Sequence, residues 1–296
     1  MATCPWDRDD PDLAPSLARG TRRGRGGSGV LAATGCPRAD RRPLGRLTRP
    51  TTQRSAATAR SLSLTLPLRR LLVLIAAGLI GAFAVIPHLL AHMAQFLVTG
   101  IVVAIAVAAG TWLAPRVGLA TPLIDAVLSR QPFVGRARSV AGIAVGLGVL
   151  AALAVFAIDA AFASLVPSRE TTPAISAPPL WTGVLAALYG GLTEEIVVHY
   201  GVMSLLVWLL TKVVPGPSAY WAAIGGAAVV LGLGHLSAIA AALPLTSLVV
   251  TRAIVLNGVA GVVFGWLYWH RGLEAAMLSH GIAALILHVA VPGIGM

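Results

Sequence analysis

Long uninterrupted blocks of aliphatic residues constrain the fold of this chain more than any other feature of its sequence. Crossing a bilayer takes about 20 residues of helix, and the sequence contains seven blocks of roughly that length or more. They are residues 71–90, 96–114, 140–166, 180–210, 219–242, 247–268 and 273–291. The predicted fold is therefore all-α, a polytopic membrane helix bundle of about seven transmembrane helices.

The composition supports the same prediction. Of the 296 residues, 57% are apolar and only 11% are charged, and the mean hydropathy is +0.83. A soluble domain of this length needs far more polar surface than these residues can supply. We therefore expect an integral membrane protein of a bacterial plasma membrane, with the lipid bilayer as its surroundings.

The basic residues are distributed unevenly along the chain. The net charge is +11, and 14 of the 22 Lys and Arg residues lie in the first 70 positions. Most of the remaining basic residues fall in loops on the same side of the membrane as this segment, and cytoplasmic loops carry such an excess. The pattern predicts a cytoplasmic N-terminus and an outer C-terminus, and it explains the positive charge without a nucleic-acid partner.

Two regions are expected along the chain. Residues 1–65 are rich in Arg, Pro, Gly, Ser and Thr and show no helical or strand periodicity. Such a segment cannot bury enough apolar area to offset the entropy lost on ordering, so we expect a disordered arm. Residues 66–296 are expected to form the membrane domain.

Ionisable side chains inside the spans require a reason, because each costs roughly 2.5–3.5 kcal/mol on insertion scales. Asp159 and Arg252 lie near the ends of their spans, where they are expected to reach the interface. Glu194 and Glu195 lie in the middle of 180–210 and cannot be explained in this way.

The two glutamates are expected to have different surroundings. Adjacent residues on a helix point in different directions, whereas Glu195 and His199 are four apart and share one face, where they can form a hydrogen bond. Glu194 is then free to face a cavity. The preceding pair, Gly190 and Gly191, would permit a close helix approach or local unwinding.

Two histidines on other spans complete a set of chemically suitable side chains. His235 and His280 lie on the fifth and seventh predicted spans, and together with the glutamates they could activate a water and stabilise an oxyanion. Peptide hydrolysis requires both of these functions. The span boundaries place His235 at a different depth from Glu194 and His280, so either helix tilt or a fifth span that starts deep in the membrane must bring the residues together.

Three segments resemble, in order and spacing, the motifs of the CPBP family of membrane proteases, also called the Abi family. This family comprises type 2 CAAX prenyl proteases, bacteriocin-processing proteases and their bacterial relatives. The segments are Glu194-Glu195-Ile-Val-Val-His199 for Glu-Glu-x-x-x-Arg, Leu231-x-x-x-His235 for Phe-x-x-x-His, and His280-Gly-Ile-Ala-Ala284 for His-x-x-x-Asn/Asp.

The resemblance implies an intramembrane endopeptidase that acts on a protein or peptide at the membrane. Carried over by position, Glu194 would be the base that activates water, and Glu195 would be the orienting carboxylate. His235 and His280 would bind or polarise the water and stabilise the oxyanion. His199 would support Glu195.

The sequence departs from the family motifs at two positions. His199 replaces an arginine, and Ala284 replaces an asparagine or aspartate. Loss of one oxyanion donor typically lowers the rate by ~10²–10³. Asn257 or Arg252, in the stretch before the last motif, could compensate if their helix faces the site.

Other functions and one cofactor remain open at this stage. An impaired relative that binds or escorts a membrane partner would also fit the two departures, and a small carrier would use the same buried carboxylates. Internal hydropathy repeats would favour the carrier, and none is evident. No cofactor is required by a glutamate mechanism, although Glu194, His235 and His280 would also suit zinc.

Overall fold

The computed structural model describes residues 52–85, 93–163, 179–241 and 243–293, with side chains from residue 66 onward. Throughout these residues the regular elements are helices and no strand occurs, which confirms the all-α prediction. The first elements are α1 (Thr52–Val85), α2 (Met93–Leu113), η1 (Ala114–Val117), α3 (Pro122–Leu128), α4 (Val134–Ala163), α5 (Leu180–Leu188) and η2 (Tyr189–Met203). They are followed by α6 (Ser204–Leu210), α7 (Pro217–Gly234), α8 (Leu236–Ala240), α9 (Ser247–Arg271), α10 (Leu273–Leu285), η3 (Ile286–Ala290) and α11 (Val291–Gly293).

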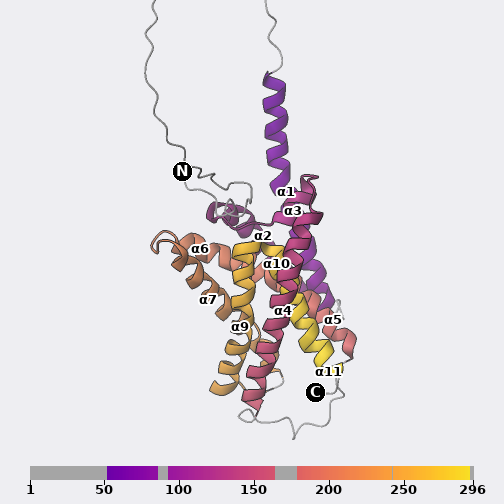
Figure 1. Cartoon of the computed structure of the whole chain (residues 1–296), viewed down its shortest axis with the longest axis vertical. Coiled ribbons are helices and arrows are strands. Elements are labelled where there is room, and N and C mark those ends of the chain that lie inside the picture. The colour runs from indigo at the N-terminus through magenta and orange to yellow at the C-terminus, as the bar shows by residue number, and fades with distance from the viewer. Residues whose placement is uncertain (1–51, 86–92, 164–178, 242, 294–296) are drawn as a thin grey trace, which may run out of the picture. The chain divides into compact units, whose positions relative to one another are not determined.

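Seven stretches of helix in the described residues are long and apolar enough to cross a membrane, as the sequence predicted. They are Leu66–Val85, Met93–Val117, Val134–Phe162, Leu180–Leu210, Pro217–Ala240, Ser247–Arg271 and Leu273–Gly293. The fourth stretch runs without a break through α5, η2 and α6 (Figure 1). It is 56% buried, against 22–33% for the others, so the helix that carries the two glutamates lies at the centre of the bundle.

Residues 1–51, most of the expected N-terminal arm, lie outside the described residues. Helix α1 begins at Thr52, upstream of the expected domain boundary at residue 66. Residues 52–66 contain neither proline nor glycine, so nothing in this sequence stops the helix from extending in that direction. The division into arm and membrane domain stays a prediction.

Small residues allow the central helix to approach its neighbours closely. The span packs against α2, α7 and α10. A Cβ atom added to Gly201 would lie 2.7 Å from the Cβ of Ala106 on α2, which leaves no room for any side chain. Close backbone approach at small residues is typical of helix packing in membranes.

One end of the bundle is held together by polar contacts between elements that carry the basic residues. Arg70 of α1 donates from Nε to Oδ1 of Asp125 in α3 over 2.7 Å. Glu274, at the start of α10, accepts a 2.7 Å hydrogen bond from the backbone N–H of Ile124. The Tyr220 hydroxyl of α7 donates to the Val117 carbonyl over 2.7 Å. These contacts place α3, η1 and the starts of α7 and α10 at one end, which we call the basic end.

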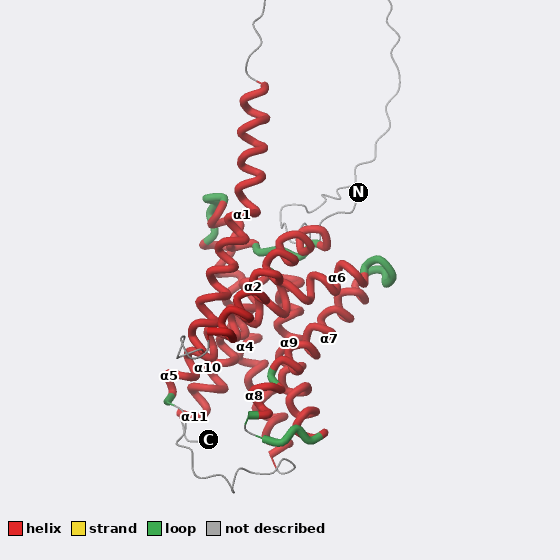
Figure 2. Tube along the Cα trace, turned by 180° about the vertical axis from the view of Figure 1, so that it is seen from behind, coloured by secondary structure: helices red, strands yellow, loops and turns green. Residues whose placement is uncertain are grey.

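The opposite end has one ion pair between described residues of α4 and α9. Arg252 donates from Nε to Oδ1 of Asp159 over 2.7 Å. Both residues were expected to reach the interface separately, and the structure pairs them instead. Figure 1 and Figure 2 show this end at the bottom of each view, with α11, and Figure 2 also labels α8 toward this end.

Candidate active site

Glu194 and Glu195 lie on a π-helix and not on the α-helix that the sequence analysis assumed. Element η2 extends from Tyr189 to Met203. Its hydrogen bonds join residue i to residue i+5. This arrangement is rare in proteins overall, and where it occurs it is frequently at a functional site. Residues five apart therefore come close to one face, which places Tyr189 beside Glu194 on the wall of one cavity.

The glycine pair at the start of η2 permits α10 to lie directly against it. A Cβ atom on Gly190 would lie 2.7 Å from Nε2 of His280, and one on Gly191 would lie 2.9 Å from the carbonyl oxygen of Met277. The sequence analysis expected close approach or local unwinding at this pair. The structure shows the close approach, and it places the π-helix at the same position.

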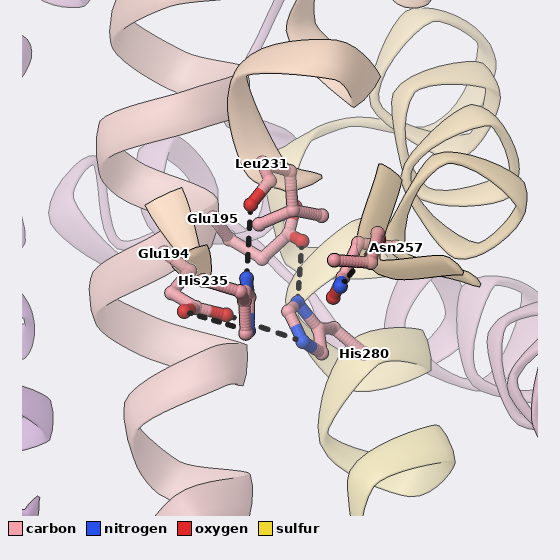
Figure 3. Close-up of polar contacts among 7 residues, drawn as sticks. Glu194, Glu195, Leu231, His235, Asn257 and His280 are labelled. Atoms are coloured by element: carbon pink, nitrogen blue, oxygen red, sulfur yellow. Dashed lines mark hydrogen bonds and ion pairs between the residues drawn. The ribbon is translucent and has the colours of Figure 1, made fainter. Parts of the chain in front are cut away.

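Glu195 is completely buried between the imidazole rings of His199 and His280, and Figure 3 shows its contact with His280. Its Oε1 lies 2.8 Å from Nδ1 of His280, within hydrogen-bonding distance. Its Oε2 lies 2.8 Å from Nδ1 of His199, although this contact is not aligned as a hydrogen bond. The expected proximity of Glu195 and His199 is therefore present as a close polar contact, and Glu195 also holds His280.

The ring of His199 is fixed from its other side by helix α9. Nε2 of His199 lies 3.2 Å from the carbonyl oxygen of Gly261. A carbonyl can only accept, so Nε2 carries a proton. His199 thus occupies the place of the family's arginine as a partner of the buried carboxylate.

The carboxylate of Glu194 faces two histidines, and each of its oxygens lies near a different one. Oε1 lies 3.6 Å from Nε2 of His235, and Oε2 lies 3.6 Å from Nε2 of His280. These separations are too long for direct hydrogen bonds. When two polar groups lie more than 3.5 Å apart, a water molecule can bridge them.

The far nitrogens of both rings are already engaged, and this fixes which nitrogen faces Glu194. Nδ1 of His235 donates to the carbonyl oxygen of Leu231 over 2.9 Å. Nδ1 of His280 is bound to Glu195, and the ring of Phe264 stacks on His280 at 4.5 Å between centroids. In the neutral form each histidine therefore directs an unprotonated Nε2 toward Glu194.

The sequence placed His235 at a different depth, and the course of α7 explains why the gap closes. Helix α7 ends at Gly234, and the chain turns at His235 into the short α8. Both views show α7 running obliquely beside α9 (Figures 1 and 2). A tilted helix advances less across the membrane per residue than an upright one, so tilt brings His235 to the level of Glu194.

The side chains of Glu194, His235 and His280 line a cavity of about 460 Å³. Tyr189, Asn257 and Ala284 also line it. A smaller and mainly apolar cavity of about 230 Å³, between α2, η2 and α7, shares Tyr189, Glu194 and Gly234 with it. Glu194 is 17% exposed and His235 35% exposed, so both can be reached by a small molecule, whereas Glu195 is not accessible.

Of the two residues expected to compensate for Ala284, the structure brings only Asn257 to the cavity. Its Nδ2 donates to the carbonyl oxygen of Ala253 over 2.9 Å, which holds the amide beside the helix and leaves a second N–H. Arg252 does not line the cavity, since its guanidinium is bound to Asp159 near the end of α4. The expectation that Arg252 supports the site is therefore not met.

Two residues of the site were missed in the sequence analysis. Phe264 stacks on His280 and lines the cavity, and Tyr189 adjoins Glu194. The spacing of five between Tyr189 and Glu194 indicates a shared face only in a π-helix. Nothing in the sequence pattern of α9 distinguishes Phe264 from a residue that packs against lipid.

Within the described residues, no group of three or more His, Cys, Asp or Glu side chains is placed so that it could hold a metal ion. In the zinc set of Glu194, His235 and His280, each histidine Nε2 lies 3.6 Å from an oxygen of Glu194.

These observations define a membrane-embedded protein with a carboxylate and two imidazoles at a buried cavity. Residues 176–286 match the family model described as Type II CAAX prenyl endopeptidase Rce1-like. This match confirms the resemblance to the CPBP proteases, and the matched family is one of type II CAAX prenyl endopeptidases. No curated protein and no solved structure matched the chain.

Proposed function

We propose that this protein is an intramembrane endopeptidase in which Glu194 activates the water that attacks the peptide bond. The observation that carries the proposal is the position of its carboxylate. Each oxygen of Glu194 stands 3.6 Å from Nε2 of a different histidine. The far nitrogen of each ring is tied, in one case to a backbone carbonyl and in the other to Glu195.

A water that donates one hydrogen to Glu194 and the other to Nε2 of His280 would be placed for attack. Glu194 takes one proton from the water as the oxygen of the water bonds to the carbonyl carbon. If His235 enters the reaction doubly protonated, its Nε2–H and the second N–H of Asn257 would donate to the resulting oxyanion, and neither proton is transferred. Glu194 then delivers its proton to the amide nitrogen as the carbon–nitrogen bond breaks.

Glu195 is proposed as a positioning residue. It is completely buried, and both of its oxygens contact imidazole nitrogens at 2.8 Å. A carboxylate in this position cannot reach a substrate, but it fixes the orientation and the tautomer of His280. His199 and the Gly261 carbonyl extend this support to α9.

A catalytically impaired relative is the second candidate, and Ala284 is the observation that favours it. This residue lines the cavity at the third motif, where the family has a polar side chain, and it supplies only a methyl group. Such a protein would retain the binding cavity and bind a membrane partner without hydrolysing it.

The test is a peptidase assay on protein purified in detergent, with metal analysis of the same sample. Glu194→Gln keeps the shape of the side chain and removes the base, so hydrolysis should fall by ~10²–10⁴. Glu274→Gln, a second membrane-embedded carboxylate outside the site, serves as the control and should retain activity.

Three other results would change the proposal. Equal activity in wild type and Glu194→Gln would exclude Glu194 as the base. Hydrolysis that appears only after Ala284→Asn would identify an impaired relative. Stoichiometric zinc that disappears in His235→Ala would replace the metal-free mechanism with a metal-assisted one.

A further inference from the structure

The cavity that contains Glu194 has exposed lining residues at one end of the bundle. Its outer residues are exposed and belong to the end of α1, the start of α2, the short α8 and η3; they are Val85, Gln95, Ser237, Ala238 and His288. Its inner residues include Glu194 and His280, which are only 17% and 14% exposed. Burial therefore increases from this rim toward the site.

Tightly packed side chains lie between the site and the basic end. Phe264, Tyr200 and Tyr268 are at most 1% exposed. The Tyr200 hydroxyl donates to Thr111 over 3.1 Å, and the hydroxyls of Tyr268 and Ser204 lie 2.9 Å apart. Tyr200 follows the two glutamates on η2, and Phe264 and Tyr268 lie on α9 toward Arg271, so these three residues form a floor beneath the site on that side.

The charges of the described residues distinguish the two ends. Those at the basic end are Arg69, Arg70, Arg116, Arg130, Arg136, Arg138, Lys212 and Arg271. At the end where the cavity opens, the described basic side chain is Arg252, and Asp159 neutralises it. Lysine and arginine accumulate on the cytoplasmic side of membrane proteins, so the open end is the outer one.

We infer that the cavity opens on the extracytoplasmic side of the membrane, and that its substrate is a polypeptide presented from that side. The kind of reaction rests on the proposed function, whereas the direction of access rests on the rim, the floor and the charges. A C-terminal tail in the cytoplasm would meet the packed aromatic floor. An exported peptide, or the outer segment of a membrane protein, would meet the open rim.

The experiment compares two exposed serines at opposite ends. Ser237 lies on the cavity rim, and Ser129 follows α3 at the basic end. Each is changed to cysteine in the full chain after Cys4 and Cys36 have been replaced by serine. A membrane-impermeant maleimide is then added to right-side-out and to inside-out membrane vesicles.

Ser237→Cys is expected to react in right-side-out vesicles and not in inside-out ones, and Ser129→Cys should show the reverse. The opposite pattern would overturn the inference, as would a Ser237→Cys that reacts only after denaturation. In the peptidase assay, a bulky maleimide on Ser237→Cys should block hydrolysis, whereas one on Ser129→Cys should not. Expected labelling without any hydrolysis would leave the direction of access intact and refute the proposed function.

Discussion

Two carboxylates in membrane-spanning segments of this protein have opposite kinds of surroundings. At the basic end, Oε1 of Glu274 accepts a 2.7 Å hydrogen bond from the Ile124 backbone and joins α10 to the start of α3. At the site, Glu194 faces His235 and His280 at 3.6 Å and borders two cavities. The first carboxylate is in direct contact with its partner, while the second has room for a water.

This difference separates a structural role from a chemical one. A side chain that is hydrogen-bonded to backbone holds two elements together, and its loss leaves a buried donor without a partner. A side chain whose partners lie one water away can exchange a proton with that water. Burial and charge alone would not have distinguished Glu194 from Glu274.

After the loss of Glu194 itself, the largest expected effect is at Asn257, which lines the same cavity. Asn257→Ala should lower kcat by ~10²–10³, as the loss of one oxyanion donor does, without changing the unfolding temperature. Adding Ala284→Asn to this variant should recover part of the rate, because it places an amide on the wall of the same cavity. A double variant no faster than Asn257→Ala would show that the two positions are not equivalent.

A shortened carboxylate tests whether the spacing at Glu194 matters. Glu194→Asp retracts the oxygens from both histidines, and a misplacement of about 1 Å can reduce the rate by ~10². The assay is kcat/KM on a peptide substrate, with unfolding followed in detergent. Unchanged kinetics would mean that the two 3.6 Å separations do not define the reacting geometry.

At the basic end we expect a loss of stability without a loss of activity. Glu274→Ala leaves the Ile124 N–H without its acceptor and should lower the free energy of unfolding by about 1–3 kcal/mol. The rate per folded molecule should remain that of wild type. A large fall in kcat at unchanged stability would contradict the structural role of this carboxylate.

The smallest effect is expected in the layer between the two regions. Tyr268→Phe removes the hydroxyl that pairs with Ser204 and should cost about 0.5–1.5 kcal/mol, the usual net contribution of one hydrogen bond. The apolar ring remains, so the floor of the site should stay closed and kcat should not change. Denaturant unfolding and the peptidase assay together check both expectations.

Hydropathy was sufficient to predict the helices, and motif spacing was sufficient to predict which polar residues gather. The seven spans were expected from aliphatic blocks alone, and the structure brings Glu194, Glu195, His235 and His280 together. The hydropathy of each span is local in the sequence. The order and spacing of the motifs are known from the family resemblance.

The rest depended on contacts that no local pattern encodes. The sequence does not reveal that η2 is a π-helix, since the hydrogen-bond register depends on how α10 packs against Gly190 and Gly191. The place of His199 depends on Gly261 and on Gly265, where an added Cβ would lie 3.3 Å from Nε2 of His199. The pairing of Arg252 with Asp159 likewise links residues far apart in the sequence.

The aromatic floor has a consequence for the membrane itself. Hydrolysis needs water midway through the bilayer, yet a continuous chain of water and ionisable groups across it would conduct protons and dissipate the membrane potential. Tyr200, Phe264 and Tyr268 interrupt any such chain toward the basic end, because they are packed to at most 1% exposure. The protein can thus hold a carboxylate that is accessible to water within the membrane and still prevent protons from leaking across the bilayer.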